Sequence, residues 1–208
     1  MKQHYDNIDE YISDLKKEIA ANDKCANHYY NLGMAFLHKR DFVAAEEAFL
    51  DALRNSPHLA EAYVQLGGIC LERGDLDGCL GYNEQAASCR PKFSIAQSNI
   101  AFVHLQRGEP DKAIAALNKA LSWNPNFIQA RNAMATALFM KENFADSEKI
   151  SREIISSEPN FAPAWNNLAL ALMEQNKVEE AIAAIDKAVE LGFVPSEKFL
   201  EELKPHRK

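Results

Sequence analysis

The sequence predicts an all-α protein: an α-α superhelix, or solenoid, of five helical hairpins with N- and C-terminal capping helices. Three kinds of observation predict this fold: prolines with a fixed period, other residues with the same period, and apolar stripes with helical spacing. Each proline lies 34 residues after the one before: Pro57, Pro91, Pro125 and Pro159. Such a period is typical of repeat architectures, in which each repeat buries its apolar face against its neighbours.

Small and apolar residues recur with the same period. The series are Gly33, Gly67, Ala101, Ala135 and Ala169; Leu32, Leu66, Ile100, Met134 and Leu168; and Ala52, Ala86, Ala120, Ile154 and Ala188. With the prolines, four series share one period of 34 residues, which is very unlikely by chance. The small residues have a physical use, because they let two helix backbones approach closely.

Each repeat is predicted to form two helices, as the unit 26–59 illustrates. Its first helix carries an apolar stripe at the i, i+3, i+4 and i+7 spacing of an α-helix: Tyr29, Leu32, Gly33 and Phe36. Its second helix carries another: Ala45, Phe49 and Ala52. Pro57 follows, where a helix must end.

The turns between the paired helices support this prediction. The equivalent positions hold Arg40, Gly74, Gly108, Glu142 and Asn176. Three of the five are Gly or Asn, which tolerate the left-handed conformation that ends a helix. Pro110 comes two residues after Gly108 and suits the first turn of the following helix.

This pattern resembles the tetratricopeptide repeat (TPR). The first repeat matches it in full: Tyr29, Leu32, Gly33, Phe36, Ala45, Phe49, Ala52 and Pro57. The resemblance covers residues 26–195 and divides them into repeats at 26–59, 60–93, 94–127, 128–161 and 162–195. Later repeats depart from the pattern at Cys70, Cys79, Asn83, Gln97, His104, Arg131, Ser147, Ser151, Ile154 and Phe193. The fourth repeat departs most, so we expect it to be the softest inner part of the stack.

The two ends are predicted to be capping segments, at 1–25 and 196–208. Residues 8–21 carry a helical stripe: Ile8, Tyr11, Ile12, Leu15 and Ile19. The last segment carries Phe199, Leu200 and Leu203 before a basic tail. Inner repeats expose apolar surface on both sides, so a solenoid needs caps. A swapped or partner-binding helix is the alternative.

Composition narrows the class of function. The net charge is −7, the wrong sign for a protein whose main partner is nucleic acid or an anionic membrane. No apolar run approaches the roughly 20 residues that span a bilayer. The sequence starts Met1-Lys2-Gln3-His4 without an apolar signal segment, so we expect a cytoplasmic protein.

No catalytic motif is visible, and we expect a protein that is not an enzyme and uses no cofactor or metal. Cys70, Cys79 and His104 occupy core positions of neighbouring repeats, where a metal or redox site is imaginable. Their spacing is not that of a metal site, and buried Cys behaves as a small apolar residue. Reduced, structural thiols are the preferred interpretation.

The resemblance implies that the outward side of each first helix lines a concave groove for an extended or helical peptide. The candidate peptide-binding residues are Tyr30, Asn31, Met34, Gln65, Asn99, Phe102, Asn132, Phe139, Asn166, Asn167, Leu170 and Met173. One repeat position holds Asn31, Gln65, Asn99, Ala133 and Asn167, an amide ladder that could bond a peptide backbone. Two alternatives stay open: these amides are simply common in the repeat, and some of the apolar residues pack against a neighbouring helix.

The sequence therefore predicts an interaction module that binds a protein or peptide segment, as an adaptor, assembly factor or chaperone-like protein. A self-assembling scaffold is the alternative function. We expect a monomer or weak homo-oligomer. The partner itself is not named by the fold.

Overall fold

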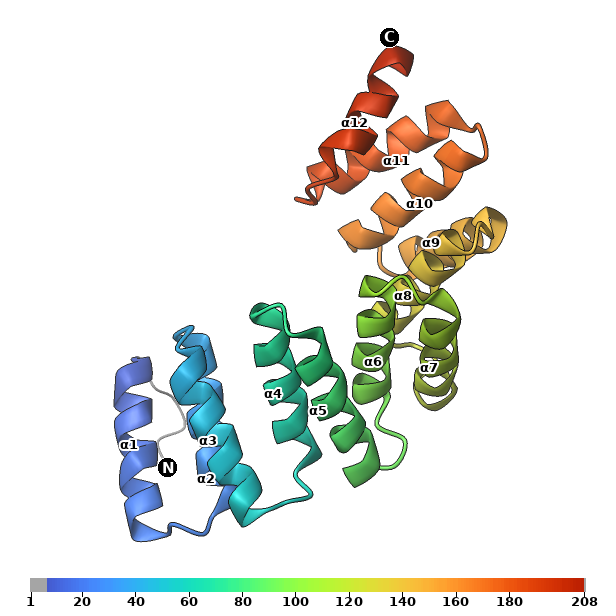
Figure 1. Ribbon diagram of the computed structural model, residues 1–208. Helices are drawn as coiled ribbons and strands as arrows, with labels where there is room; N and C mark the ends of the chain where they lie inside the picture. Colours follow the sequence, from blue (N-terminus) through green and yellow to red (C-terminus); the bar gives the residue numbers. More distant parts are fainter. Residues whose placement is uncertain (1–6, 208) are drawn as a thin grey trace. The chain divides into compact units, whose positions relative to one another are not determined.

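The computed structural model describes residues 7–207, which form twelve α-helices and one short 3-10 helix (Figure 1). The helices are α1 (Ile8–Ala21), α2 (Ala26–His38), α3 (Phe42–Asn55), α4 (Ala60–Glu72), α5 (Leu76–Cys89), α6 (Ser94–Gln106), α7 (Pro110–Trp123), α8 (Ile128–Met140), α9 (Phe144–Ser157), α10 (Ala162–Glu174), α11 (Val178–Glu190) and α12 (Glu197–Leu203), with the 3-10 helix at Lys204–His206. The predicted all-α class is confirmed. Residues 1–6 and 208, which belong to the predicted terminal segments, lie outside the described part.

The chain divides into two compact units, Met1–Asn99 and Ile100–Lys208, with the division inside α6. Helices that follow one another pack together: α2 with α3 and α4 with α5 in the first unit, and α8 with α9 and α10 with α11 in the second. We call α2, α4, α6, α8 and α10 the A helices, and α3, α5, α7, α9 and α11 the B helices. None of the helices within residues 7–207 is long and apolar enough to cross a membrane.

A left-handed residue ends every A helix, at the five positions that the sequence pattern indicated. The φ angles are 59° at Arg40, 75° at Gly74, 71° at Gly108, 61° at Glu142 and 60° at Asn176. The residue after each one donates its backbone N–H to a carbonyl oxygen five residues back, as Asp41 does to Phe36 over 3.0 Å. This bond satisfies a carbonyl group that the end of the helix leaves free.

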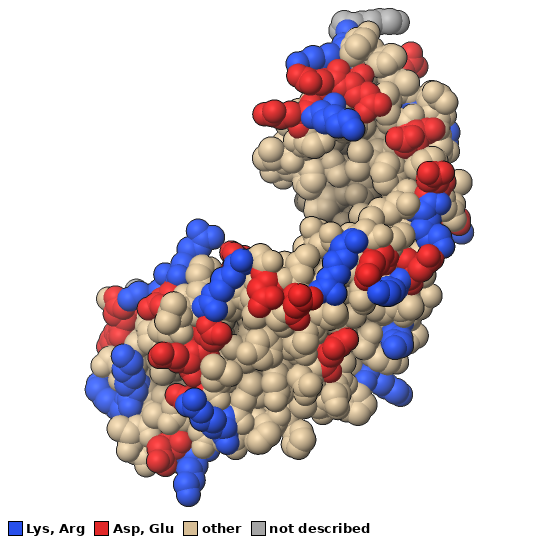
Figure 2. Space-filling view, in the orientation of Figure 1, with Lys and Arg blue, Asp and Glu red and all other residues tan. Residues whose placement is uncertain are grey.

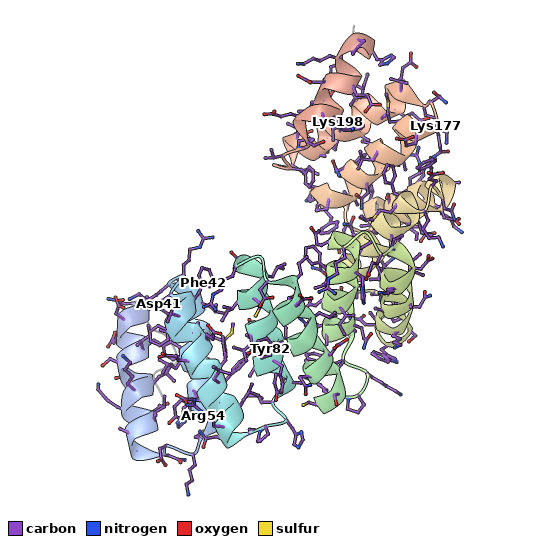
Figure 3. The ribbon with its side chains drawn as sticks, in the orientation of Figure 1. Asp41, Phe42, Arg54, Tyr82, Lys177 and Lys198 are labelled. Atoms are coloured by element: carbon purple, nitrogen blue, oxygen red, sulfur yellow. The ribbon has the colours of Figure 1, made fainter. Side chains whose placement is uncertain are left out.

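Polar side chains then start several of the B helices. Asp41 accepts a hydrogen bond from the backbone N–H of Ala44, and Asp75 accepts one from that of Gly78. Figure 3 shows Asp41 and Phe42 at this start of α3. Such N-caps satisfy backbone donors that the first helical turn leaves unpaired, so each hairpin turn closes one helix and opens the next.

The core of the first unit depends on small residues opposite large ones. The Phe49 ring is fully buried and lies against Gly33, where an added Cβ would come within 2.6 Å of it. The cap α1 buries Ile12 and Leu15 against the first hairpin. The expectation that small residues allow close helix approach is confirmed here.

The core of the second unit ends in the predicted C-terminal cap. Phe199 and Leu203 of α12 are buried with Leu172 and Ile185 of the last hairpin. The chain turns into this cap at Gly192, whose φ of 87° is left-handed. Both capping helices therefore cover apolar surface of the hairpin beside them.

Candidate peptide-binding surfaces

The predicted site residues come from A helices of both units. In the first unit they are Tyr30, Asn31, Met34, Gln65 and Asn99. In the second unit they are Phe102, Asn132, Phe139, Asn166, Asn167, Leu170 and Met173.

Large apolar side chains are exposed on the A helices of both units. The first unit exposes Met34, Leu71 and Ile95, which we call the first-unit surface. The second unit exposes Phe102 and Met140, which we call the second-unit surface. Met34 and Phe102, at equivalent repeat positions, are each 39% exposed. The B helices expose Val43, Trp123 and Val189, one on each of three helices. Apolar side chains left in solvent on several A helices indicate an interaction surface.

Tyr30 does not point away from the hairpin core, which corrects the sequence-based expectation. Its ring centroid lies 5.6 Å from that of Phe49, and it packs on the buried cluster that includes Leu66 of the next hairpin. Burial raises the pKa of the Tyr30 hydroxyl, although a hydrogen bond with Gln65 lowers it in part. Tyr30 therefore joins the first two hairpins, as the alternative interpretation held.

Three apolar candidates of the second unit also pack inside it. Leu170 and Met173 lie against the buried cluster of the last hairpin. The Phe139 ring lies 5.3 Å from that of Phe144, which begins the next helix. Of the predicted apolar site residues, Met34 and Phe102 are exposed. Met140 is exposed to the same extent.

Asn99 is tied to a buried amide of the preceding hairpin. Its Nδ2 donates to Oδ1 of Asn83 over 2.9 Å, and Asn83 Nδ2 donates to the Cys79 carbonyl oxygen over 2.8 Å. Asn83 is fully buried at a position where the first repeat has Phe49. The sequence marked Asn83 as a departure from the repeat but missed its pairing, which gives Asn99 a structural role.

Asn167 is likewise part of an internal network, which corrects the expectation that it lies outside the core. It is 9% exposed, and its Nδ2 lies 3.0 Å from Asn132 Oδ1, 3.1 Å from Thr136 Oγ and 3.3 Å from the Asn132 carbonyl oxygen. These bonds fasten α10 to α8. A polar group this deep would be costly without such partners.

The network fixes which atoms of the amides are left over. Asn167 Oδ1 and Asn132 Nδ2 make no hydrogen bond within residues 7–207, and neither is a buried unpaired atom. The pair offers one free acceptor and one free donor on neighbouring side chains, on α10 and α8.

Serines fill two core positions of the fourth repeat where an apolar or aromatic residue was expected. Ser147 and Ser151 are fully buried; Ser147 Oγ donates to the Ala135 carbonyl oxygen over 2.9 Å, and Ser151 Oγ to that of Ser147 over 2.8 Å. Hydrogen bonds thus satisfy the hydroxyls of a repeat that buries less apolar surface.

A carboxylate on α9 holds the last two hairpins together. Glu148 accepts hydrogen bonds from Lys177 Nζ, Arg152 Nε and Gln175 Nε2, each over 2.8 Å. Lys177 lies in the turn between α10 and α11 (Figure 3). Burial alone would raise the pKa of Glu148, but the three donors outweigh it and bring that pKa to about 2.

Cys70, Cys79 and His104 are the residues at which the sequence allows metal or redox chemistry. Cys70 and Cys79 are buried free thiols whose pKa burial raises. His104 is half-buried, with Nδ1 2.7 Å from Glu109 Oε2. No group of three or more His, Cys, Asp or Glu within residues 7–207 is arranged to hold a metal ion.

On the visible face of each unit, basic and acidic side chains are interspersed (Figure 2).

Tetratricopeptide repeat models match residues 12–60, 104–165 and 162–191. The chain belongs to the tetratricopeptide repeat family. TPR proteins generally mediate protein–protein interactions and bind protein or peptide partners. They are typically interaction modules rather than enzymes. No curated protein is a significant sequence match to this chain.

Several solved structures have a similar fold. YrrB, a TPR protein with an unusual peptide-binding site, is 19% identical over 92% of this chain and 97% of its own, with a TM-score of 0.70. A TPR protein from Parabacteroides merdae is 19% identical over 90% of this chain and 74% of its own, with a TM-score of 0.76. PilW, a type IV pilus biogenesis factor, is 21% identical over 82% and 79%, with a TM-score of 0.74. At these identities the likeness establishes the fold alone.

Proposed function

We propose that this TPR chain is a non-enzymatic adaptor or assembly factor that binds a segment of another protein on its A helices. The observation that carries the proposal is the exposure of Met34 and Phe102, together with Leu71, Ile95 and Met140, on those helices. Removing such side chains from water favours association by about 25 cal/mol per Å². Methionine adapts its shape to varied partners, which suits a surface of this kind.

The free amide atoms supply polar recognition beside the apolar contacts. Asn132 Nδ2 can donate to a backbone carbonyl of the bound segment, and Asn167 Oδ1 can accept from a backbone N–H. A peptide backbone carries both groups at every residue except proline. Asn99 is held by Asn83 through its nitrogen and offers its oxygen in the same way. The amides thus bind backbone, and the apolar residues select side chains.

Similarity to YrrB supports the class of ligand, since that protein of like fold has a peptide-binding site. The proposal for this chain is a partly apolar, amide-bearing surface on each unit. Asn31, Gln65 and Asn166 are half-buried on the same helices and complete the set of amides.

Selection from a random peptide library, followed by affinity measurements, tests the proposal. A selected peptide should bind Met34→Ser and Phe102→Ser about tenfold more weakly than the parent, about 1.4 kcal/mol for each lost apolar contact. Val43→Ser is the matched control, because Val43 is exposed on the B helix α3. Equal affinity of the parent and both A-helix variants would reject the proposal.

Self-assembly is the second candidate, and one feature of the second unit favours it. Val189 near the end of α11 and Val194 in the following turn are exposed, Val194 by 88%. Light scattering separates the two functions. A monomer at high concentration supports the adaptor; assemblies that grow with concentration and are lost in Val194→Ser support the scaffold.

A further inference from the structure

A pocket of about 470 Å³ lies in the first unit, and the residues that line it are not among the predicted peptide-binding residues. Its walls come from α3, α4 and α5, and include Glu46, Cys70, Asp75, Gly81 and Tyr82. The Tyr82 ring is anchored from α5 on the core shared by the first two hairpins (Figure 3). The pocket therefore has a rigid floor.

The pocket exists because the second repeat has lost bulk. Cys70 stands where the first repeat carries Phe36, and Gly81 lies in the middle of α5. Cys70 is itself buried, so its thiol forms part of the wall. A side chain of ordinary size at either position would reduce the space.

Gly81 has no packing reason to be glycine. At Gly33, Gly67 and Gly78 an added Cβ would approach other side-chain atoms to within 2.6, 2.4 and 2.3 Å, so a side chain there would displace a neighbour. At Gly81 an added Cβ would meet no atom within 4 Å, and the backbone is an ordinary helix. Glycine inside a helix costs about 1 kcal/mol relative to alanine. The missing side chain at Gly81 leaves open the space on that side of the pocket.

The charge of the pocket indicates what enters it. Its lining carries the carboxylates of Glu46 and Asp75 against one guanidinium, that of Arg73, which already binds Glu46 over 2.7 Å. Burial first, and then the charges of Asp75 and Glu46, raise the pKa of the Cys70 thiol, although Arg73 lowers it in part. Burial first, then Cys70 and the same two carboxylates, raise the pKa of Tyr82. The interior is therefore electronegative and favours a cation.

We propose that this pocket is a second binding site, which takes an arginine or lysine side chain of a protein partner. The alkyl part of the side chain fills the space beside Gly81, and its charged end lies near Glu46 and over the Tyr82 ring. Carboxylates and aromatic faces both attract such cations. The site shares no residue with the A-helix surfaces, so it stands or falls independently of the function proposed for them.

The probe is a blocked Gly-Arg-Gly peptide, compared with the same peptide in which neutral citrulline replaces arginine. Titrations followed by amide chemical shifts of the full chain should move residues 70–82 with the arginine peptide. The citrulline peptide should bind at least about fivefold more weakly, because it lacks the charge. Equal binding of the two peptides, or shifts confined to other residues, would overturn the proposal.

Two variants test the location. Gly81→Leu should fill the pocket and weaken the arginine peptide about tenfold, whereas Gly68→Leu should not, since Gly68 is an equally open helix glycine outside the pocket. Circular dichroism checks that both variants are folded. Glu46→Gln provides a second test that leaves the volume unchanged and should weaken binding several-fold. Parent-like affinity in folded Gly81→Leu, or in Glu46→Gln, would contradict the site.

Discussion

Asn167 on α10 donates its amide to Asn132 on α8, with 3.0 Å between Nδ2 and Oδ1. This bond links the A helices of two neighbouring hairpins and determines which amide atoms remain for a ligand. The same side chain thus contributes to stability and, in our proposal, to recognition. A substitution of Asn167 is therefore expected to change both the stability of the fold and the binding of a ligand.

The first prediction concerns the stability that this amide supplies. Asn167→Ala should lower the free energy of unfolding by about 1–3 kcal/mol, because Asn132 Oδ1 and Thr136 Oγ lose a donor in a largely buried site. Urea denaturation measures the loss. Asn166→Ala is the control, since Asn166 is a half-buried neighbour on the same helix. A loss no greater than that of the control would show that the network is not stabilising.

The second prediction concerns the left-handed turn residues. Arg40→Gly and Glu142→Gly should each raise stability by about 0.5–1 kcal/mol, because a side chain at positive φ is strained and glycine is not. Thermal melting is the measurement. Gly74→Ala, the reverse change at the equivalent turn, should lower the melting temperature. A lower melting temperature for Arg40→Gly and Glu142→Gly, or a higher one for Gly74→Ala, would refute the strain argument.

The third prediction concerns pH. The folded-state pKa of Glu148 is about 2, below its ordinary value near 4.3 in an unfolded chain. The group therefore stabilises the fold above about pH 4.5, and this contribution is lost as the pH falls toward 2. Glu148→Gln should cost about 2 kcal/mol at pH 7 and progressively less in acid.

The control for Glu148→Gln is Glu158→Gln, which removes an exposed carboxylate just after the same helix. Denaturation curves at pH 7, 4 and 2.5 supply the comparison. A stability difference between Glu148→Gln and the parent that did not shrink in acid would mean that the three donors do not hold the carboxylate as described.

The fourth prediction concerns local stability. In α9, Ser147 and Ser151 occupy core positions, whereas α3 buries Ala45, Phe49 and Ala52 at its own. Less apolar burial should make opening easier, since stability in a solenoid is local. Amide hydrogen exchange in residues 143–157 should therefore be faster than in 44–55. Equal or slower exchange in 143–157 would show that the serine hydrogen bonds replace the missing apolar surface in full.

Much of the fold could be predicted because the same sequence pattern, and therefore the same helical hairpin, recurs in each repeat. The turn positions from Arg40 to Asn176 share one backbone conformation, although only three of the five carry Gly or Asn. The candidate site was harder to predict. An apolar stripe shows which face of a helix packs inside its own hairpin. It does not show which residues contact the next hairpin. Tyr30 and Asn167 lie off the stripe and are nevertheless packed against neighbouring helices.

The pocket beside Tyr82 was missed for a different reason. It depends on the small size of Cys70 and Gly81. Motifs of chemically active residues do not reveal a pocket that arises from small side chains. Its one signal in the sequence is a glycine inside a predicted helix, away from any turn. The pairing of Asn83 with Asn99 gave no periodic signal, because the two residues belong to different repeats and different repeat positions.

The most direct test of the central claim is a chemical-shift map of the full chain with a bound peptide from the library selection. We expect the largest amide shifts in the A helices, around Met34, Leu71, Phe102 and the Asn132–Asn167 pair. The B helices α3, α7 and α11 should change little. Shifts concentrated in those B helices, with the A helices unmoved, would contradict the account.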